Sequence, residues 1–143
     1  MIKRYATKEM SRIWSDQNKF ETWKNVEIAV VEVLSELGEV PKESLNIIKQ
    51  KAAFSVERID EIEAETHHDV IAFLTNLAEN IGPDSRFVHM GMTSSDLLDT
   101  SLALQCQEAG NIILSKLKSF KALLRSKALI YRDTFQIGRS HGV

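Results

Sequence analysis

Apolar residues recur at three- and four-residue spacing along most of the chain, a pattern that predicts amphipathic helices. The clearest stripe lies between residues 16 and 37, where Gly38 then ends the helix. Its members are Phe20, Trp23, Val26, Val30, Val33, Leu34 and Leu37. The pattern also predicts shorter helices at residues 7–14, with Thr7 as the cap, at 42–52 after Pro41, and at 55–62 with Ser55 as the cap.

Two T-x-x-D sequences are typical of capping boxes, in which the two side chains satisfy amides at a helix start. The first, Thr66 to Asp69, predicts a helix that Gly82 and Pro83 close. The second, Thr93 to Asp96, opens the longest helical segment, which runs to about residue 131 with only Gly110 as an interruption.

The apolar residues of this longest segment follow an 11-residue repeat, which predicts a nearly straight helix. They are Leu98, Leu102, Cys106, Ala109, Ile113, Leu117, Phe120, Leu124 and Ala128. About 38 helical residues span roughly 57 Å, whereas a compact chain of this length has a diameter of about 37 Å. We therefore expect helices of other subunits, or of a C-terminal continuation, to cover the stretch from Ile113 to Ala128.

Composition supports a helical fold and limits the number of domains. The 143 residues allow one core, so two large independent domains are excluded. With 43% hydrophobic residues but only 6 Gly and 2 Pro, the chain is too apolar to be disordered and too poor in turn residues for a many-stranded sheet. The fold class predicted is all-α.

Charge and cysteine usage narrow the partners. The net charge of −2 argues against a nucleic-acid or anionic-membrane binder, although residues 111–143 carry 7 Lys and Arg against 1 acidic residue. That basic end either complements a helix dipole or receives anions. The single Cys106 excludes an internal disulfide, and the chain has neither a signal-peptide stretch nor a run long enough to cross a bilayer. We expect a cytoplasmic location.

The four histidines lie at helix edges or in Gly-containing turns, where a side chain can titrate near neutral pH and serve as a general acid or base. They are His67, His68, His89 and His141. Taken singly, a histidine in such a place is more often a structural hydrogen-bonding residue. The two helix starts suit phosphate or carboxylate, and at the second one Thr93, Ser94 and Ser95 add hydroxyl groups. A metal site built from His67 to Asp69 and His89 lacks any familiar ligand spacing such as H-E-x-x-H.

Four blocks of sequence resemble the adenylosuccinate lyase family of the fumarase/aspartase superfamily, and together they extend over essentially the whole chain. They are the opening Met-Ile-Lys-Arg-Tyr, His-Asp-Val-Ile-Ala-Phe at 68–73, His-Met-Gly-Met-Thr-Ser-Ser-Asp at 89–96 with Asp99 and Thr100, and Gly-Arg-Ser-His-Gly at 138–142. One block alone would indicate only the superfamily.

The resemblance implies an all-α enzyme of purine nucleotide synthesis that forms a homotetramer around a central helical bundle. Residues 1–93 would be its N-terminal helical domain, and 94–143 the start of the bundle domain. It implies β-elimination of fumarate from adenylosuccinate and from succinyl-aminoimidazole carboxamide ribotide, with a nucleotide substrate and no cofactor or metal. Family members are about three times as long, and their loop serine lies beyond residue 143. We therefore expect an N-terminal fragment that is inactive alone.

The resemblance also implies roles for individual residues. His141 matches the general acid and His68 a helper in proton transfer. The nucleotide-contacting positions are matched by Arg4, Tyr5, Thr93 and Ser94, and a substrate-binding stretch by His67, His68 and Asp69; His89 and Ser95 are further candidates. Where His67 stands the family often has Arg, which puts a direct anion contact at that position in doubt.

Two alternatives stay open. One is another lyase of the superfamily, such as an argininosuccinate lyase or a carboxymuconate cycloisomerase, which the Arg4-Tyr5 opening disfavours. The other is a non-catalytic helical assembly module, which is compatible with the helical pattern alone.

Overall fold

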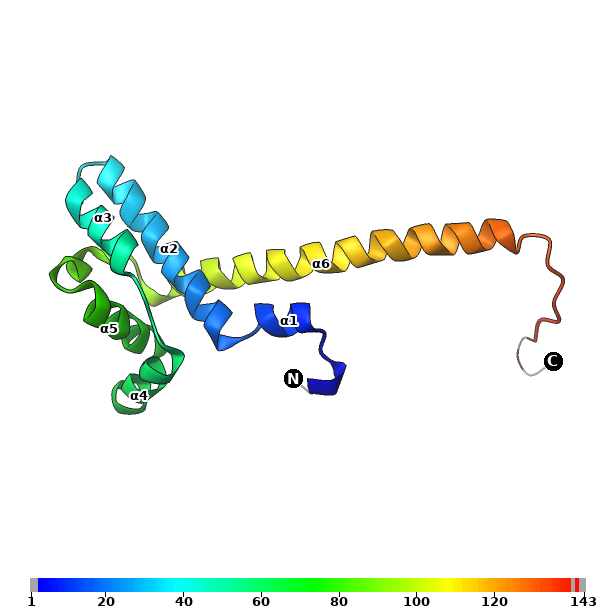
Figure 1. Ribbon diagram of the computed structural model, residues 1–143, viewed down its shortest axis with the longest axis horizontal. Coiled ribbons are helices and arrows are strands. Elements are labelled where there is room, and N and C mark those ends of the chain that lie inside the picture. The colour runs from blue at the N-terminus through cyan, green and yellow to red at the C-terminus, as the bar shows by residue number, and fades with distance from the viewer. Residues whose placement is uncertain (1–2, 140, 142–143) are drawn as a thin grey trace. The chain divides into compact units, whose positions relative to one another are not determined.

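The computed structural model describes residues 3–139 and 141, and every regular element in them is a helix (Figure 1). In chain order these are η1 (Lys3–Tyr5), α1 (Lys8–Ile13), α2 (Asp16–Glu36), α3 (Lys42–Lys51), α4 (Val56–Thr66), α5 (Asp69–Ile81), η2 (Pro83–Phe87) and α6 (Ser94–Ile130). The all-α prediction is confirmed. None of the helices described is long and apolar enough to span a membrane.

Most helix limits follow from caps that the sequence announces. Thr7 accepts the backbone N–H of Met10, and Ser15 that of Asn18, so α1 and α2 begin as their N-cap side chains require. After α2 the chain turns at Gly38, whose φ of 82° is the left-handed conformation that glycine adopts without strain. Gly110 does not interrupt α6, because the rest of that helix tolerates one residue of low propensity.

The first of the two predicted capping boxes is wrong. Thr66 ends α4 and donates its hydroxyl to the Ile62 carbonyl, instead of capping the next helix. A left-handed residue at His67 stops α4, and His68 becomes the N-cap of α5. The second box forms in part: the Asp96 carboxylate accepts the Thr93 backbone N–H at 2.8 Å, whereas the Thr93 hydroxyl donates to that carboxylate and accepts no amide of the described residues.

The chain divides into two compact units, Met1–Glu108 and Ala109–Val143, and the division falls inside α6. The predicted domain boundary between residues 93 and 94 stays a prediction. In the first unit, four aromatic rings from α2, α5 and the α3–α4 connection form the centre of the core. Phe20 stacks on Phe73 with ring centroids 5.7 Å apart, and Trp23 and Phe54 meet that pair edge to face. Such geometry adds about 0.5–1.5 kcal/mol per pair to the burial itself.

The beginning of α6 packs on the first unit with a face that apolar spacing does not reveal. Leu97, Ser101 and Gln105 are buried, whereas Leu102 is 52% exposed and Cys106 is also exposed. Gln105 lies inward because its amide donates to the Ile13 carbonyl at 2.8 Å. From residue 97 to residue 105 the buried face is therefore one position earlier than the apolar stripe, and two of its three residues are polar.

Candidate active site

In the described residues, the only side-chain-bearing positions with positive φ are three histidines: His67 (51°), His89 (64°) and His141 (52°). Left-handed backbone costs a residue with a Cβ about 1–2 kcal/mol. Strained residues of this kind concentrate at functional sites, because the surrounding structure must hold them in place. Three of the four histidines singled out from the sequence thus share a backbone feature that the sequence did not reveal.

His67, His68 and Asp69 form the junction between α4 and α5. His67 is the C-cap of α4, where its backbone N–H donates to the Glu63 carbonyl at 2.8 Å, and its side chain is exposed. Asp69 is the first residue of α5 and accepts the Val70 backbone N–H at 2.7 Å. His68 and Asp69 lie at the N-terminus of α5, where the dipole favours negative charge, whereas His67 lies at the C-terminus of α4.

His68 has a structural role in addition to its candidate chemical one. Its Nδ1 accepts the backbone N–H of Ile71 at 3.4 Å, a long bond that caps α5, and its side chain is 47% exposed. A nitrogen that accepts a hydrogen bond carries no proton, so the neutral ring has its proton at Nε2. Nε2–H is therefore the donor that His68 can offer to a ligand.

His89 lies in the connection between η2 and α6, in a turn closed by the Met92 N–H and the His89 carbonyl. Its backbone N–H donates to Oε2 of Glu27 at 2.8 Å, and its Nδ1 lies 2.6 Å from Oε1 of the same carboxylate. The His89 side chain is 19% exposed and that of Glu27 only 1%. A buried carboxylate thus binds the histidine twice.

Sequence reasoning missed Glu27. The signal was present, because Glu27 stands seven residues after Phe20 and four after Trp23, both of which face the core. An acidic residue on the buried face of a helix requires a partner, since an unpaired charge is costly to bury. The sequence alone does not name that partner, which lies 62 positions further along.

The start of α6 carries three hydroxyl residues, of which Ser94 is half-buried and Thr93 and Ser95 are exposed. The Asp96 carboxylate lies 2.8 Å from the Thr93 backbone nitrogen and 3.2 Å from its hydroxyl. An anionic ligand at this helix start would therefore share it with a carboxylate. Thr93 and Ser94 are better suited to donating single hydrogen bonds than to forming a full anion cradle.

Arg4 and Tyr5 lie together in η1. The Arg4 guanidinium donates to the Tyr5 hydroxyl at 3.0 Å and its Cζ lies 4.9 Å from the ring centroid, while Tyr5 is 71% exposed. The exposed pair offers a cation and a phenol to a ligand. No hydrogen bond or ion pair in residues 3–139 and 141 joins Arg4 or Tyr5, or the junction at 67–69, to the segment 89–95.

His141 belongs to the second unit and is exposed. Gly138 and Arg139 of its block are described with it, whereas the predictions that fall on Ser140 and Gly142 lie outside the described residues. Among the described residues, no group of three or more His, Cys, Asp or Glu side chains is placed to hold a metal ion.

A family model described as Lyase matches residues 3–143. The chain belongs to this family. Over all of its 143 residues the chain is 49% identical to the adenylosuccinate lyase of Synechocystis sp. and 42% identical to that of Bacillus subtilis, and it covers 33% of each. It also resembles the crystal structure of 3-carboxy-cis,cis-muconate lactonizing enzyme from Pseudomonas putida, with a TM-score of 0.89 and 26% identity over 97% of this chain and 33% of that one.

The chain thus spans about a third of the length of the curated relatives that it matches. The family and the fold expected from the four sequence blocks are confirmed, and the roles of the single residues stay predictions.

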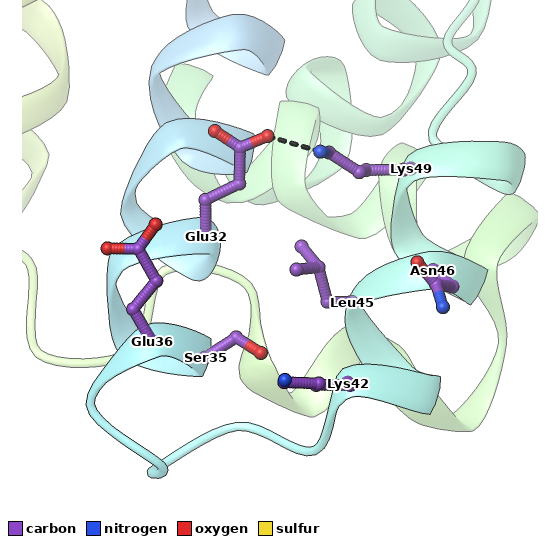
Figure 2. A pocket seen from close by; sticks show the side chains of 7 residues that line it. All are labelled: Glu32, Ser35, Glu36, Lys42, Leu45, Asn46 and Lys49. Atoms are coloured by element: carbon purple, nitrogen blue, oxygen red, sulfur yellow. Dashed lines mark ion pairs between the residues drawn. The ribbon is translucent and has the colours of Figure 1, made fainter.

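One surface cleft of the chain contains none of the predicted site residues. Figure 2 shows it between α2 and α3, with Glu32 and Lys49 joined as an ion pair across it. The other lining residues are Ser35, Glu36, Lys42, Leu45 and Asn46. Its mixed charges and exposed ion pair indicate ordinary solvated surface, which makes Glu32 a suitable position for control substitutions.

Proposed function

We propose that this chain is part of an adenylosuccinate lyase, an enzyme that eliminates fumarate from adenylosuccinate to leave AMP, and from succinyl-aminoimidazole carboxamide ribotide to leave the carboxamide ribotide. The observation that carries the proposal is the 49% identity over the full 143 residues to an adenylosuccinate lyase. The enzyme would act in cytoplasmic purine nucleotide synthesis, without a cofactor or metal.

The elimination requires three changes. A base takes a proton from the carbon next to the one that bears nitrogen, the carbon–nitrogen bond breaks with its electron pair on nitrogen, and an acid protonates that nitrogen. We assign the acid to His141 and the assisting proton transfer to His68. The tautomer of His68, with its proton at Nε2, supports a donor role for this residue.

The substrate would be bound through its phosphate and its two carboxylates. We assign nucleotide contacts to Arg4, Tyr5, Thr93 and Ser94, and contacts with the rest of the substrate to His67, His68 and Asp69; His89 and Ser95 are further candidates. The exposed guanidinium of Arg4, which can bind an oxyanion through two N–H groups, supports the first of these assignments.

A homo-oligomer is the proposed assembly, with a tetramer as its expected form. In the second unit, apolar side chains of α6 follow one another on the surface at helical spacing. They are Ile113 (51% exposed), Leu117 (55%), Phe120 (55%) and Leu124 (52%). An apolar stripe of this length is unfavourable in water and favours a covering helix.

A chimera tests the function. In the Bacillus subtilis relative, the segment that matches this chain is replaced by the chain itself, and conversion of adenylosuccinate is followed by its ultraviolet absorbance. We expect turnover that falls about 10²-fold in kcat for His141→Ala. Glu32→Gln is the matched control and leaves kcat unchanged. A soluble chimera without turnover, or a His141→Ala variant with normal kcat, would refute the proposal or the assignment of His141, respectively.

A further inference from the structure

In the core of the first unit, both oxygens of one buried carboxylate form hydrogen bonds with the same residue. Both oxygens of Glu27 bind His89, one through the backbone N–H at 2.8 Å and one through Nδ1 at 2.6 Å. In the part of the chain that the structure describes, these are the only hydrogen bonds or ion pairs recorded for this side chain. With 1% exposure, it has almost no access to water as a substitute partner.

These two hydrogen bonds fix the backbone conformation, the ring orientation and the tautomer of His89. The bond to the backbone N–H holds residue 89 in its left-handed conformation, with φ of 64°. The bond to Nδ1 fixes the ring about its side-chain torsions. Because an ionised carboxylate can only accept, Nδ1 must carry a proton, and the histidine can then gain or lose a proton only at Nε2.

We propose that Glu27 is a positioning residue that fixes the ring orientation of His89 and the proton at its Nδ1, so that the doubly protonated ring donates Nε2–H to an oxyanion of the substrate, with the Glu27 carboxylate as its counter-charge. The partial exposure of His89, at 19%, leaves the ring accessible, whereas Glu27 does not touch the ligand. The oxyanion is a phosphate or a carboxylate. That the ligand is a phosphate or a carboxylate of the substrate rests on the proposed function. The tautomer of His89 rests only on its hydrogen bond to Glu27.

The first test needs no ligand. Nitrogen NMR of this chain with labelled histidine should show a protonated Nδ1 and an unprotonated Nε2 in the neutral ring of His89. In Glu27→Gln, the amide oxygen can still accept the backbone N–H, which places the amide NH₂ against Nδ1 and moves the ring proton to Nε2. Glu32→Gln, on the same helix, should leave the ring unchanged. If the spectrum of the unsubstituted chain shows that Nδ1 of His89 is unprotonated, the proposal is wrong. This outcome needs no variant.

The second test asks whether Glu27 acts through His89. Affinities for AMP and for fumarate are measured in the chimera with Glu27→Gln, with His89→Asn and with both, since Asn tolerates a left-handed backbone. We expect Glu27→Gln to weaken binding of one ligand about fivefold or more, and to add little in the His89→Asn background. A loss confined to AMP assigns Nε2 to phosphate, and a loss confined to fumarate assigns it to carboxylate.

Equal losses in both backgrounds would show that Glu27 merely supports the fold, and would overturn the positioning role. If the unsubstituted chimera neither turns over adenylosuccinate nor binds either ligand, the proposed function fails, while the ring measurement still decides whether Glu27 sets the tautomer.

Discussion

His68 combines a helix cap with a proposed catalytic role, and two substitutions can separate the two. His68→Ala removes the cap and the imidazole together. His68→Asn removes the imidazole but supplies a side chain that is among the preferred N-caps. If the proposed role is right, both variants lose activity, but only the first loses stability.

The structure sets the size of the stability effect. Loss of a good N-cap costs about 0.5–2 kcal/mol. The bond from the Ile71 N–H to His68 Nδ1 is 3.4 Å long, beyond the usual 2.7–3.2 Å range, and the side chain is half exposed. We therefore expect the low end, about 0.5 kcal/mol, which corresponds to a melting temperature about 2–4 °C lower in a domain of roughly 100 residues.

Two assays check this prediction. Circular dichroism of the 143-residue chain follows thermal unfolding, and adenylosuccinate turnover is measured in the chimera. His68→Asn should melt at or above the temperature of the unsubstituted chain, yet reduce kcat about 10²-fold, as does His68→Ala. Normal kcat in His68→Asn would remove the imidazole from the mechanism. A loss of more than about 8 °C in His68→Ala would show that His68 stabilises the fold by more than its cap.

Three further changes test other parts of the molecule. Arg4→Ala should weaken AMP binding to the chimera in calorimetry, with little change in melting temperature, because the side chain is exposed. Replacing Leu117 and Leu124 by Lys should shift the isolated chain from oligomer towards monomer in sedimentation, because both side chains belong to the exposed apolar stripe. Glu79→Gln should reduce the loss of stability at acid pH. Hydrogen bonds from Arg58 and then Asn76 hold the pKa of Glu79 below its ordinary value of 4.5. The stability that the ionised Glu79 carboxylate adds is therefore present above pH 4.5 and is lost as the pH falls through the lower pKa of the folded state.

Each of these predictions has an outcome that contradicts it. Unchanged AMP affinity with a large fall in melting temperature would make Arg4 a structural residue. A stable monomer of the unsubstituted chain at micromolar concentration would mean that the apolar stripe needs no partner. Identical stability curves between about pH 3 and pH 6 for Glu79→Gln and the unsubstituted chain would show that the ion pair with Arg58 adds nothing measurable.

Helix positions were predictable because their determinants are local. Thr7 and Ser15 lie within three residues of the amides that they cap, and Gly38 directly follows Leu37, the C-cap of α2. The Thr66 capping box failed for a reason that local pattern cannot supply. The chain adopts a left-handed turn at His67, which moves the cap of α5 two residues along, to His68.

Tertiary pairs were beyond the reach of the sequence. The inward face of α6 is decided by the Gln105 amide meeting the Ile13 carbonyl, 92 positions earlier, and apolar spacing contains no trace of that contact. The same is true of the carboxylate that holds His89. In both cases a polar residue is buried because a distant partner satisfies it, so hydrophobic periodicity points to the wrong face or to no partner at all.

Of the four histidines, only His68, the N-cap of α5, has an ordinary negative φ. At three positions with positive φ the chain has glycine, namely Gly38, Gly82 and Gly91, with φ of 82°, 83° and 76°. At His67, His89 and His141 the same half of conformational space is given to an imidazole, at a conformational cost that glycine would avoid. A Gly substitution at His67, whose side chain is exposed, should therefore relax the turn while it removes the ring, and it leaves no buried group unpaired. Stability that holds or rises, together with weaker ligand binding, would show that the strained conformation is kept for the side chain and not for the fold.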